Sequence, residues 1–435
     1  MLFFLVLLMS LLRDCGSVNI TTDVLGTTFT VTCTDADAGT FQPKVIFFWW
    51  SGRSDTTDAA GAASHDRGFG WAVSTSDRRC VVSRSLDSNN TMTNSSGHSD
   101  AACIITVSTS TDAIDGAIDL DALLSTGFRL IVDDVMPRAL RVHWMALGGT
   151  DPSFESITFT QQAGTGDQDV QTFAGSPTAF LFLSAALRAN PPSGGVWSPF
   201  GIGAASGTGA TEQACLGCTA EDAIADGITM AYCRDGEVIG LITATDNPNN
   251  RATFTSFLAN GFRVNWAETD TTAIRHFVLG VSGISMKVFT LLTQTNTTTP
   301  ISSGSLGMTP KAALYFSANA AEDAANTSHV HDSCSIGGAV SPQNRRCHAV
   351  LDEDAVANSD VETAVEHDEV YANLSTSAAI EGLMDVTDFG LDSIMHIMDD
   401  ADPSQSFVWG LAFGVPTEAE YIKPTLQAVK RASFF

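Results

Sequence analysis

Short apolar runs recur along this 435-residue chain, and turns rich in Gly, Asp, Ser and Thr separate them. The clearest example is Gly127–Gly149, GFRLIVDDVMPRALRVHWMALGG, in which apolar residues take alternate positions from Phe128 and again from Val142. Alternation with a period of two predicts strands with one buried face. Two such strands around a polar turn predict a β-hairpin.

The same segment occurs three times. Gly261–Gly283 and, more loosely, Gly390–Gly414 repeat its entering Gly, its polar turn and its closing apolar strand. A Pro-led apolar strand lies upstream of each copy, at Pro43, Pro177 and Pro310. These prolines are 134 and 133 residues apart, and the entering glycines are 134 and 129 apart. Two independent landmarks therefore predict three tandem copies of one β-domain.

A third landmark is a Gly-containing strand at Gly68, Gly227 and Ile336. The chain contains 44% hydrophobic and 16% charged residues, and no stretch shows a long helical period, so the predicted class is all-β. The predicted order is an N-terminal apolar segment at 1–25, three antiparallel β-sandwich repeats at 26–150, 151–283 and 284–415, and a tail at 416–435.

The apolar positions of the three copies define the predicted cores. Trp144 of the first copy corresponds to Val278 in the second and is retained as Trp409 in the third. Val45–Trp50 is apolar at every position, which predicts a strand between two sheets or in a subunit contact. The residues expected to be buried are Phe128, Val142, Trp144, Ala146, Phe262, Ile394, Phe407 and Trp409.

Net charge and the N-terminal run exclude some partners. The formal net charge of −27, with 22 basic against 49 acidic residues, argues against a nucleic-acid surface. The apolar run Leu2–Leu12 is too short to cross a bilayer. It is a secretory signal without a charged leader, a buried strand or helix that anchors the chain to a neighbour, or the result of a mis-assigned start codon.

Polar loops follow the Pro-led strand of each repeat, at Ser51–Asp66, Asn190–Cys218 and Asn319–Ser333. In repeat 2 the stretch between Leu187 and Asp226 is rich in Gly and Pro, and we interpret it as a long surface insertion without regular structure. Deleting Pro191–Gly217 should then leave the strands folded. Val81–Ala101 in repeat 1 is likewise predicted to be a polar loop.

Recognition or self-assembly is predicted for these three loops, because loops that follow equivalent strands emerge at the same end of each sandwich. They would form one composite face. Trp197 and Phe200 would lie on it, ready to stack on a sugar or pack on a partner. The alternative for Trp197 is that it folds down onto its own domain.

His65-Asp66 and His331-Asp332 precede corresponding strands in repeats 1 and 3 and are further candidate binding residues. Asp before a strand ordinarily accepts backbone N–H bonds in a turn. His329 and His331 would face the same way, which allows metal binding, although no third ligand follows from the sequence.

The other metal candidates are weak. The acidic turns at Asp133 and at Asp399–Asp402 could hold calcium, but turn formation explains them without an ion. Cys215 and Cys218 form a CxxC pair without a partner pair, so thiols or a local disulfide are favoured. We predict no resident metal and no cofactor.

No catalytic signature is found in the sequence. It contains no GxSxG elbow, no HExxH and no phosphate-binding loop between a strand and a helix. Paired carboxylates for glycoside cleavage are defined by their separation in space, so inspection leaves that alternative open. The prediction is that the protein is not an enzyme.

The order of a Pro-led apolar strand, a polar loop, a GF strand and a closing V-x-W-x-A-x-G, seen at Pro43–Trp50 and Gly127–Gly149, resembles the H-type lectin domain. The resemblance implies a small antiparallel β-sandwich that assembles as trimers and binds N-acetylgalactosamine-type sugars. Similar modules occur in bacteriophage tail-fibre and other virion surface proteins. No sugar-binding residue carries over.

The functional prediction is a non-enzymatic structural or adhesive component of a virion or extracellular appendage. Its expected partners are other copies of itself, other virion or appendage proteins, and a cell-surface glycan. A secreted glycan-active enzyme and a free secreted lectin remain the alternatives.

Overall fold

The computed structural model describes residues 11–21, 24–89, 93–187, 190–191, 193–221, 228–242, 248–270, 273–324, 328–354, 356, 358–377 and 379–416. The predicted N-terminal run before Leu11 and the tail from residue 417 lie outside these ranges. The described residues form strands and one 3₁₀ turn, η1 (Ala210–Glu212), which confirms the all-β prediction. Within the same ranges, no helix has the length and apolarity that a membrane crossing requires.

Six sheets form three similar face-to-face pairs, named lobes 1, 2 and 3. In lobe 1 the seven-stranded sheet has the order β1 (Leu12–Ile20), β13 (Leu140–Gly148), β5 (Pro43–Trp50), β7 (His65–Ser74), β8 (Asp77–Ser85), β9 (Asn94–Ser99) and β17 (Ser193–Val196). Its four-stranded sheet has the order β10 (Ile104–Ser108), β11 (Ala113–Leu124), β12 (Gly127–Asp134) and β2 (Thr28–Thr32). A separate two-stranded ribbon joins β3 (Thr34–Asp35) and β4 (Gly39–Thr40).

Lobes 2 and 3 repeat this order, and their four-stranded sheets are given below in the opposite direction. The sheets of lobe 2 contain β14 (Ser153–Thr160), β24 (Arg275–Ser282), β16 (Ala179–Ser184), β18 (Phe200–Ala205), β19 (Gln213–Ala220), β20 (Thr229–Asp235) and β28 (His329–Val330), and β15 (Gly166–Val170), β23 (Gly261–Glu268), β22 (Asn250–Leu258) and β21 (Ile239–Leu241). Those of lobe 3 contain β25 (Ser285–Leu292), β35 (Phe407–Pro416), β27 (Met308–Ser317), β29 (Asp332–Ser341), β30 (Asn344–Asp352), β31 (Val361–Glu366) and β6 (Ala59–Ala62), and β26 (Ile301–Ser302), β34 (Ile394–Asp400), β33 (Ile380–Phe389) and β32 (Tyr371–Leu374).

Because the strand orders match, β1 occupies the same edge position in lobe 1 that β14 and β25 occupy in lobes 2 and 3. Every residue of β1 pairs with β13, from Leu12 opposite Gly148 to Ile20 opposite Leu140. Lobe 1 therefore includes residues that the sequence assigned to a separate N-terminal segment. The boundary at residue 26 misses β1, because the mostly polar sequence LRDCGSVNI has no regular alternation of apolar residues.

Each seven-stranded sheet is buried on both faces. On β5, Val45, Phe47 and Trp49 contribute to a central core shared by all three lobes, whereas the residues between them face the four-stranded sheet of lobe 1. In the central core the Phe47 ring lies 5.6 Å from that of Phe413, which belongs to lobe 3. This double burial accounts for the uninterrupted apolar run of the Pro-led strand.

The predicted hairpin is wrong. β12 and β13 belong to different sheets and pair with different strands, and the same holds for β23 and β24 and for β34 and β35. The two strands meet through their side chains, since the rings of Phe128 and Trp144 lie 5.4 Å apart edge to face. Alternation reports which residues face the core, and it is identical whether two strands pair by hydrogen bonds or pack across a sandwich.

All eight predicted core residues are buried, which confirms that expectation. The alignment of Trp409 with Trp144, however, is wrong by one position. Trp144 pairs with Phe48 on β5, and the equivalent of that pair in lobe 3 is Gly410 with Tyr315. A shift of one residue moves a side chain to the other face of the strand, so Trp409 lies in the central core.

In lobe 3, a side chain on the neighbouring strand fills the space that Trp144 fills in lobe 1. In lobe 1 Trp144 pairs with Gly16, and its ring occupies the space where a Cβ on Gly16 would lie, 2.6 Å from that position. In lobe 3 the sizes are exchanged, with Phe289 opposite Gly410. Conserved total volume lets the same backbone carry different side chains.

Two segments predicted as loops are strands. Val81–Ala101 contains most of β8 and all of β9, and the presumed insertion of repeat 2 contains β17, β18 and β19. This stretch is the counterpart of β6, β7 and β8, so deleting Pro191–Gly217 would remove core strands. The third sequence landmark also shifts, because β18, not the strand after Gly227, corresponds to β7 and β29.

The glycines that suggested a loop serve close packing. A Cβ on Gly203 would lie 2.1 Å from the carbonyl oxygen of Val238, which belongs to the segment that enters the facing sheet. Gly70 and Gly337 take the same place in β7 and β29, with backbone carbonyl oxygens 2.5 and 2.0 Å from a built Cβ. Close approach of backbone selects Gly at these three positions.

Candidate functional site

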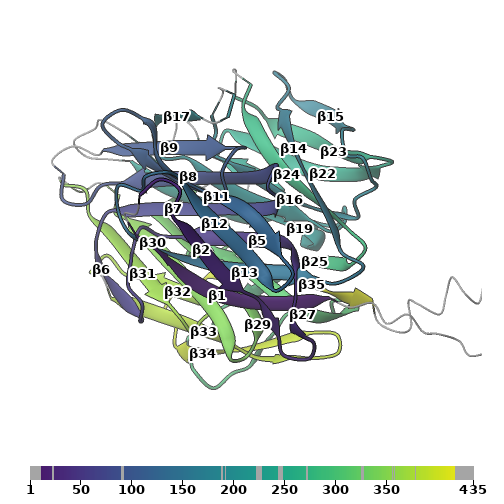
Figure 1. The fold of residues 1–435 in the computed structure, drawn as a ribbon. Coiled ribbons are helices and arrows are strands. Elements are labelled where there is room, and N and C mark those ends of the chain that lie inside the picture. Colours follow the sequence, from purple (N-terminus) through teal and green to yellow (C-terminus); the bar gives the residue numbers. More distant parts are fainter. Residues whose placement is uncertain are drawn as a thin grey trace, which may run out of the picture.

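The three loops that follow the Pro-led strands exchange strands around the molecule. β17, which follows the Pro-led strand of lobe 2, pairs with β9 of lobe 1. β28, which follows that of lobe 3, pairs with β20 of lobe 2, and β6, which follows that of lobe 1, pairs with β31 of lobe 3. Below, each exchanged strand is counted with the lobe whose Pro-led strand it follows. Figure 1 shows β17 beside β9 and β6 beside β31. Head-to-tail donation closes into a ring, so the seventh strand of every large sheet comes from another lobe.

The exchanged strands use one register. Ala62, Val196 and Val330 lie opposite Glu362, Ser95 and Met230. These three partners are equivalent, because each lies four positions before the residue that pairs with Cys80, Cys215 or Cys347 on the preceding strand. The three donations are therefore copies of one structural device.

Each exchange loop begins with a left-handed residue. Gly52, Ala186 and Asn319 are each the second residue after the Pro-led strand, with φ of 93°, 52° and 54°. The hydroxyls of Ser184 and Ser317 accept the N–H bonds of Ala186 and Asn319 at 3.1 and 2.9 Å. Positive φ is costly for Ala and persists only where the surroundings enforce it, so the departure angle of the loop is built in.

The first strand of each lobe reinforces the same junctions. Ser156 on β14 accepts a hydrogen bond from Trp71 Nε1 of lobe 1 at 2.7 Å. Cys15 on β1 and Val288 on β25 occupy the register position that Ser156 has on β14. Cys15 Sγ lies 3.9 Å from the carbonyl oxygen of Gly338 in lobe 3. Each lobe thus contacts its neighbour through both an edge strand and an exchange loop.

A buried ion pair lies in the central core. Arg67 on β7 donates to both carboxylate oxygens of Asp332 on β29, at 2.5 and 2.9 Å, and both side chains are fully buried. The guanidinium also lies 5.1 Å from the centre of the Phe200 ring. Arg67, Phe200 and Cys334 occupy equivalent positions in the three lobes. Each directly precedes the residue that pairs with the last residue of the Pro-led strand.

The groups around this pair have strongly shifted acidities. Burial alone would lower the pKa of Arg67, but the Asp332 carboxylate beside it raises that pKa above its ordinary value. Burial and, to a smaller extent, the Asp332 charge raise the pKa of Asp352 well above the usual range. Burial lowers the pKa of His65 and, to about 3, that of His348. The cluster therefore keeps one charged pair among neutral groups.

The structure places four of the six predicted binding residues in the interior. Phe200, His65, Asp66 and Asp332 are buried, so the expectation of an exposed aromatic at Phe200 is wrong. Its ring is covered because β18 lies between two cores.

Asp66 forms an ion pair with Arg138 and donates its backbone N–H to the Ser51 carbonyl at 3.1 Å.

The two His-Asp pairs do not superpose. His65 pairs with Ser85 and Asp332 with Asp352 at the same point of the sheet, so the correspondence is shifted by one residue. The remaining predicted residues, Trp197 and His331, are equivalent and half-buried, and both have positive φ, 70° and 73°. They mark the return end of the exchange loop in lobes 2 and 3.

His329 and His331 have separate partners. The Nε2 of His329 lies 2.5 Å from the Ala321 carbonyl oxygen and 3.2 Å from Asp323, whereas the Nδ1 of His331 accepts the Asp354 N–H at 2.9 Å. They belong to no metal-ligating group of three in the described residues.

Asp402 and the cysteines also have structural roles. Asp402 accepts hydrogen bonds from Thr293, Tyr371 and two turn N–H groups, which supports the turn interpretation for this residue, whereas Asp399 and Asp400 are the last residues of β34. All nine cysteines are buried free thiols. Cys215 and Cys218 lie three positions apart on β19 and contribute to different cores, so a local disulfide does not form between them.

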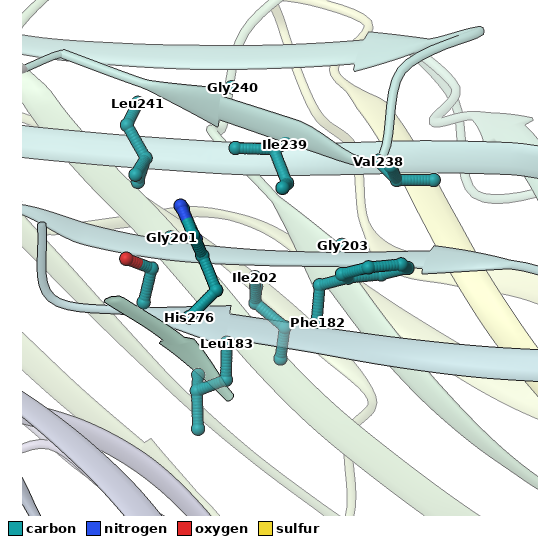
Figure 2. Close-up of a pocket in the computed structure, with 11 residues that line it drawn as sticks. Phe182, Leu183, Gly201, Ile202, Gly203, Val238, Ile239, Gly240, Leu241 and His276 are labelled. Atoms are coloured by element: carbon teal, nitrogen blue, oxygen red, sulfur yellow. The ribbon is translucent and has the colours of Figure 1, made fainter. Parts of the chain in front are cut away.

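Hollows adjoin the exchange loops of lobes 2 and 3, and that of lobe 2, about 380 Å³, is lined by Ser193, Gly194, Asp133 and Asp134 among others. The loop of lobe 3 forms one wall of a polar hollow of about 310 Å³, lined by Asn319, His331, Ser375, Thr376 and Glu381 among others. A much smaller cavity of about 10 Å³ lies inside lobe 2, where Figure 2 shows a ring nitrogen of His276 directed toward Leu241. Neither ring nitrogen of His276 has a hydrogen-bond partner, and this space admits a single water.

No protein-family model matches this chain, and no curated protein matches it either. The resemblance to H-type lectin domains thus stays an expectation from short motifs.

Sequence reasoning missed Arg67 and the exchanged strands. Arg67 is a lone charge between the predicted loop and an apolar strand, in HDRGFGWAVS, and β7 extends through it. The signal available in the sequence was the position of Arg67 directly beside the apolar strand. The exchange strands AAGA and SGGV consist almost entirely of small residues and carry no alternation of apolar and polar positions.

Proposed function

We propose that this protein is a non-enzymatic structural component of a virion or extracellular appendage, which supplies a preassembled three-lobed unit from one chain. The observation that supports it is the closed ring of exchanged strands around a shared core. Separate chains that trimerise depend on concentration, whereas covalently joined lobes meet at a fixed effective concentration. A unit of this kind suits assemblies that need a rigid, permanently trimeric part.

The ring also protects the molecule from unwanted pairing. An exposed sheet edge is a template for another strand. In each large sheet one edge is the exchanged strand itself, which has only two to four residues, and the other is the first strand of the lobe, which packs on its neighbour. The outward contacts of the unit would then be made by the four-stranded sheets and their loops.

Immunogold electron microscopy of the source culture tests this proposal. Antibodies to the recombinant chain should label particles or filaments, and mass spectrometry of that purified fraction should recover its peptides. A protein found free in the medium, together with hydrolysis of a glycan by the pure chain, would favour the secreted-enzyme alternative.

Glycan binding is a second candidate function, and the polar hollow of lobe 3 favours it. Its volume of about 310 Å³ reaches the size of small-ligand sites, and amide, hydroxyl, imidazole and carboxylate groups line it. A glycan array with the full chain should detect binding that Glu381→Gln weakens. Glu381 is exposed, so the variant should keep its melting temperature. Binding unaffected by the substitution would place the ligand elsewhere.

A further inference from the structure

The junction at which lobe 1 joins lobe 3 gathers three carboxylates. Asp58 directly precedes β6, Glu366 ends β31, and Asp368 follows two residues later. One carboxylate oxygen from each lies within 4.8 Å of the others. Asp58 is held in position by His367, whose backbone nitrogen and ring Nδ1 lie 2.8 and 3.0 Å from Asp58 Oδ1.

Glu366 is the buried member of this group, and the nearby Arg53 charge lowers its pKa only in part. The residue is 4% exposed, and its Oε1 is buried without a hydrogen-bond partner. Burial and the charges of Asp58 and Asp368 raise the pKa of Glu366 to about 8. A buried carboxylate beside two others is costly unless a proton or a cation neutralises it.

The two other junctions show how the same position is otherwise filled. In lobe 2 the residue equivalent to Glu366 is Arg234, whose Nη1 lies 3.3 Å from the carbonyl oxygen of Asp323 in the donated loop. The Arg234 charge also lowers the pKa of Asp323, although burial raises it overall to about 7. In lobe 1 the equivalent residue is the neutral Ser99. A fixed cation or a neutral group thus faces the exchange loop in both cases.

We propose that a calcium ion binds between Asp58 of lobe 1 and Glu366 and Asp368 of lobe 3, and clamps the exchanged strand β6 onto β31. Oxygen ligands alone select a hard cation. Ligands of one Ca²⁺ lie about 2.4 Å from it and hence up to about 5 Å apart, while those of Mg²⁺ span about 4 Å. Three carboxylate oxygens within 4.8 Å of one another can share one ion, and their number favours Ca²⁺, because Mg²⁺ usually keeps several waters and is bound by only one or two carboxylates.

Calcium binding to the full-length protein tests the proposal directly. After treatment with EDTA and dialysis, titration calorimetry with CaCl₂ should show one site per chain, and Ca²⁺ should raise the melting temperature more than Mg²⁺ does. Glu366→Gln and Asp58→Asn should each weaken Ca²⁺ binding by about tenfold or more. Glu322→Gln, at the junction that Arg234 serves, is the matched control and should bind Ca²⁺ like the wild type.

Two results would overturn the site. One is a folded wild-type protein that shows neither heat of Ca²⁺ binding nor a shift in melting temperature. The other is a Ca²⁺ affinity that Glu366→Gln leaves unchanged. Glu366→Gln replaces a buried acidic group by a neutral one of the same size and should melt no lower than the wild type in EDTA. If it fails to fold, Asp368→Asn gives the same test at an exposed ligand.

Discussion

The sandwich cores and the central core solve the problem of threefold repetition in different ways. In the sandwich cores equivalent positions exchange volume between neighbouring strands, as Trp144 with Gly16 and Phe289 with Gly410 show. In the central core equivalent positions differ in chemistry: Arg67, Phe200 and Cys334. The first kind of variation preserves shape, and the second distinguishes one lobe from another.

That difference teaches what a single chain gains over three identical ones. In a symmetric trimer every lobe would carry the same residue at the position of Arg67, and three like charges would meet. Here Arg67 of lobe 1 meets Asp332 of lobe 3, while Phe200 of lobe 2 covers the guanidinium. Buried ion pairs are better attested as devices of register than of net stability. We expect this pair to specify which lobe joins which.

The largest effect is expected from Asp332→Ala, which leaves the Arg67 charge buried without its partner. Breaking one side of a buried pair costs about 3–5 kcal/mol, and full burial of both groups places this case near about 5. Urea unfolding followed by tryptophan fluorescence measures the loss.

The double variant Arg67→Met with Asp332→Leu separates charge from packing. Because apolar replacement of a whole buried pair is often neutral, it should recover most of the lost free energy. A double variant as unstable as Asp332→Ala would show that the pair acts through shape and not through charge.

A somewhat smaller loss, about 4 kcal/mol, is expected for Trp144→Ala in the sandwich core of lobe 1, because it leaves a cavity beside Gly16. The third lobe suggests the rescue. Adding Gly16→Phe to Trp144→Gly reproduces the Phe289–Gly410 arrangement and should be more stable than Trp144→Gly alone. If it is less stable, the exchange of volume between β1 and β13 is not equivalent to that in lobe 3.

The sequence predicted the local features of this molecule better than its long-range contacts. Alternation and Gly spacing predicted strands, burial and the repeat, because these depend on the residue and its nearest neighbours. The pairing partners of β12 and β13 were missed, because two strands show the same alternation of apolar and polar residues whether they face each other across a sandwich or are hydrogen-bonded side by side. Gly-rich β17 and β18 were mistaken for a loop, because packing against neighbouring backbone selects the same residue that turns do.

The candidate site was harder to predict for a physical reason. Arg67 and Asp332 are 265 residues apart, and Asp58 and Glu366 belong to different lobes, so their proximity depends on the exchange of strands. A polar residue before a strand has the same local pattern whether it caps a turn or enters a buried pair. The sequence singled out the three loops, but the part they contribute to the ring depends on a neighbour that sequence periodicity does not identify.

The smallest effect concerns pH and a histidine in the sandwich core of lobe 2. Burial lowers the pKa of His276 to about 3, and its ring, stacked on Phe159 at 5.1 Å, has no hydrogen-bond partner. A group with a lowered pKa in the folded state contributes stability above its unfolded pKa of about 6.5, and this contribution is lost as the pH falls. At pH 5 the loss from His276 is about 2 kcal/mol.

His276→Phe should therefore melt at a temperature that changes less between pH 7 and pH 5 than that of the wild type, by the equivalent of about 2 kcal/mol. Comparing the same two pH values in both proteins cancels the contributions of other titrating groups. At pH 7 the variant should be at least as stable, because it removes two unpartnered polar atoms beside a small cavity. Equal pH dependence in the two proteins would mean that a buried water already bonds the ring and lets it take up a proton near its ordinary pKa.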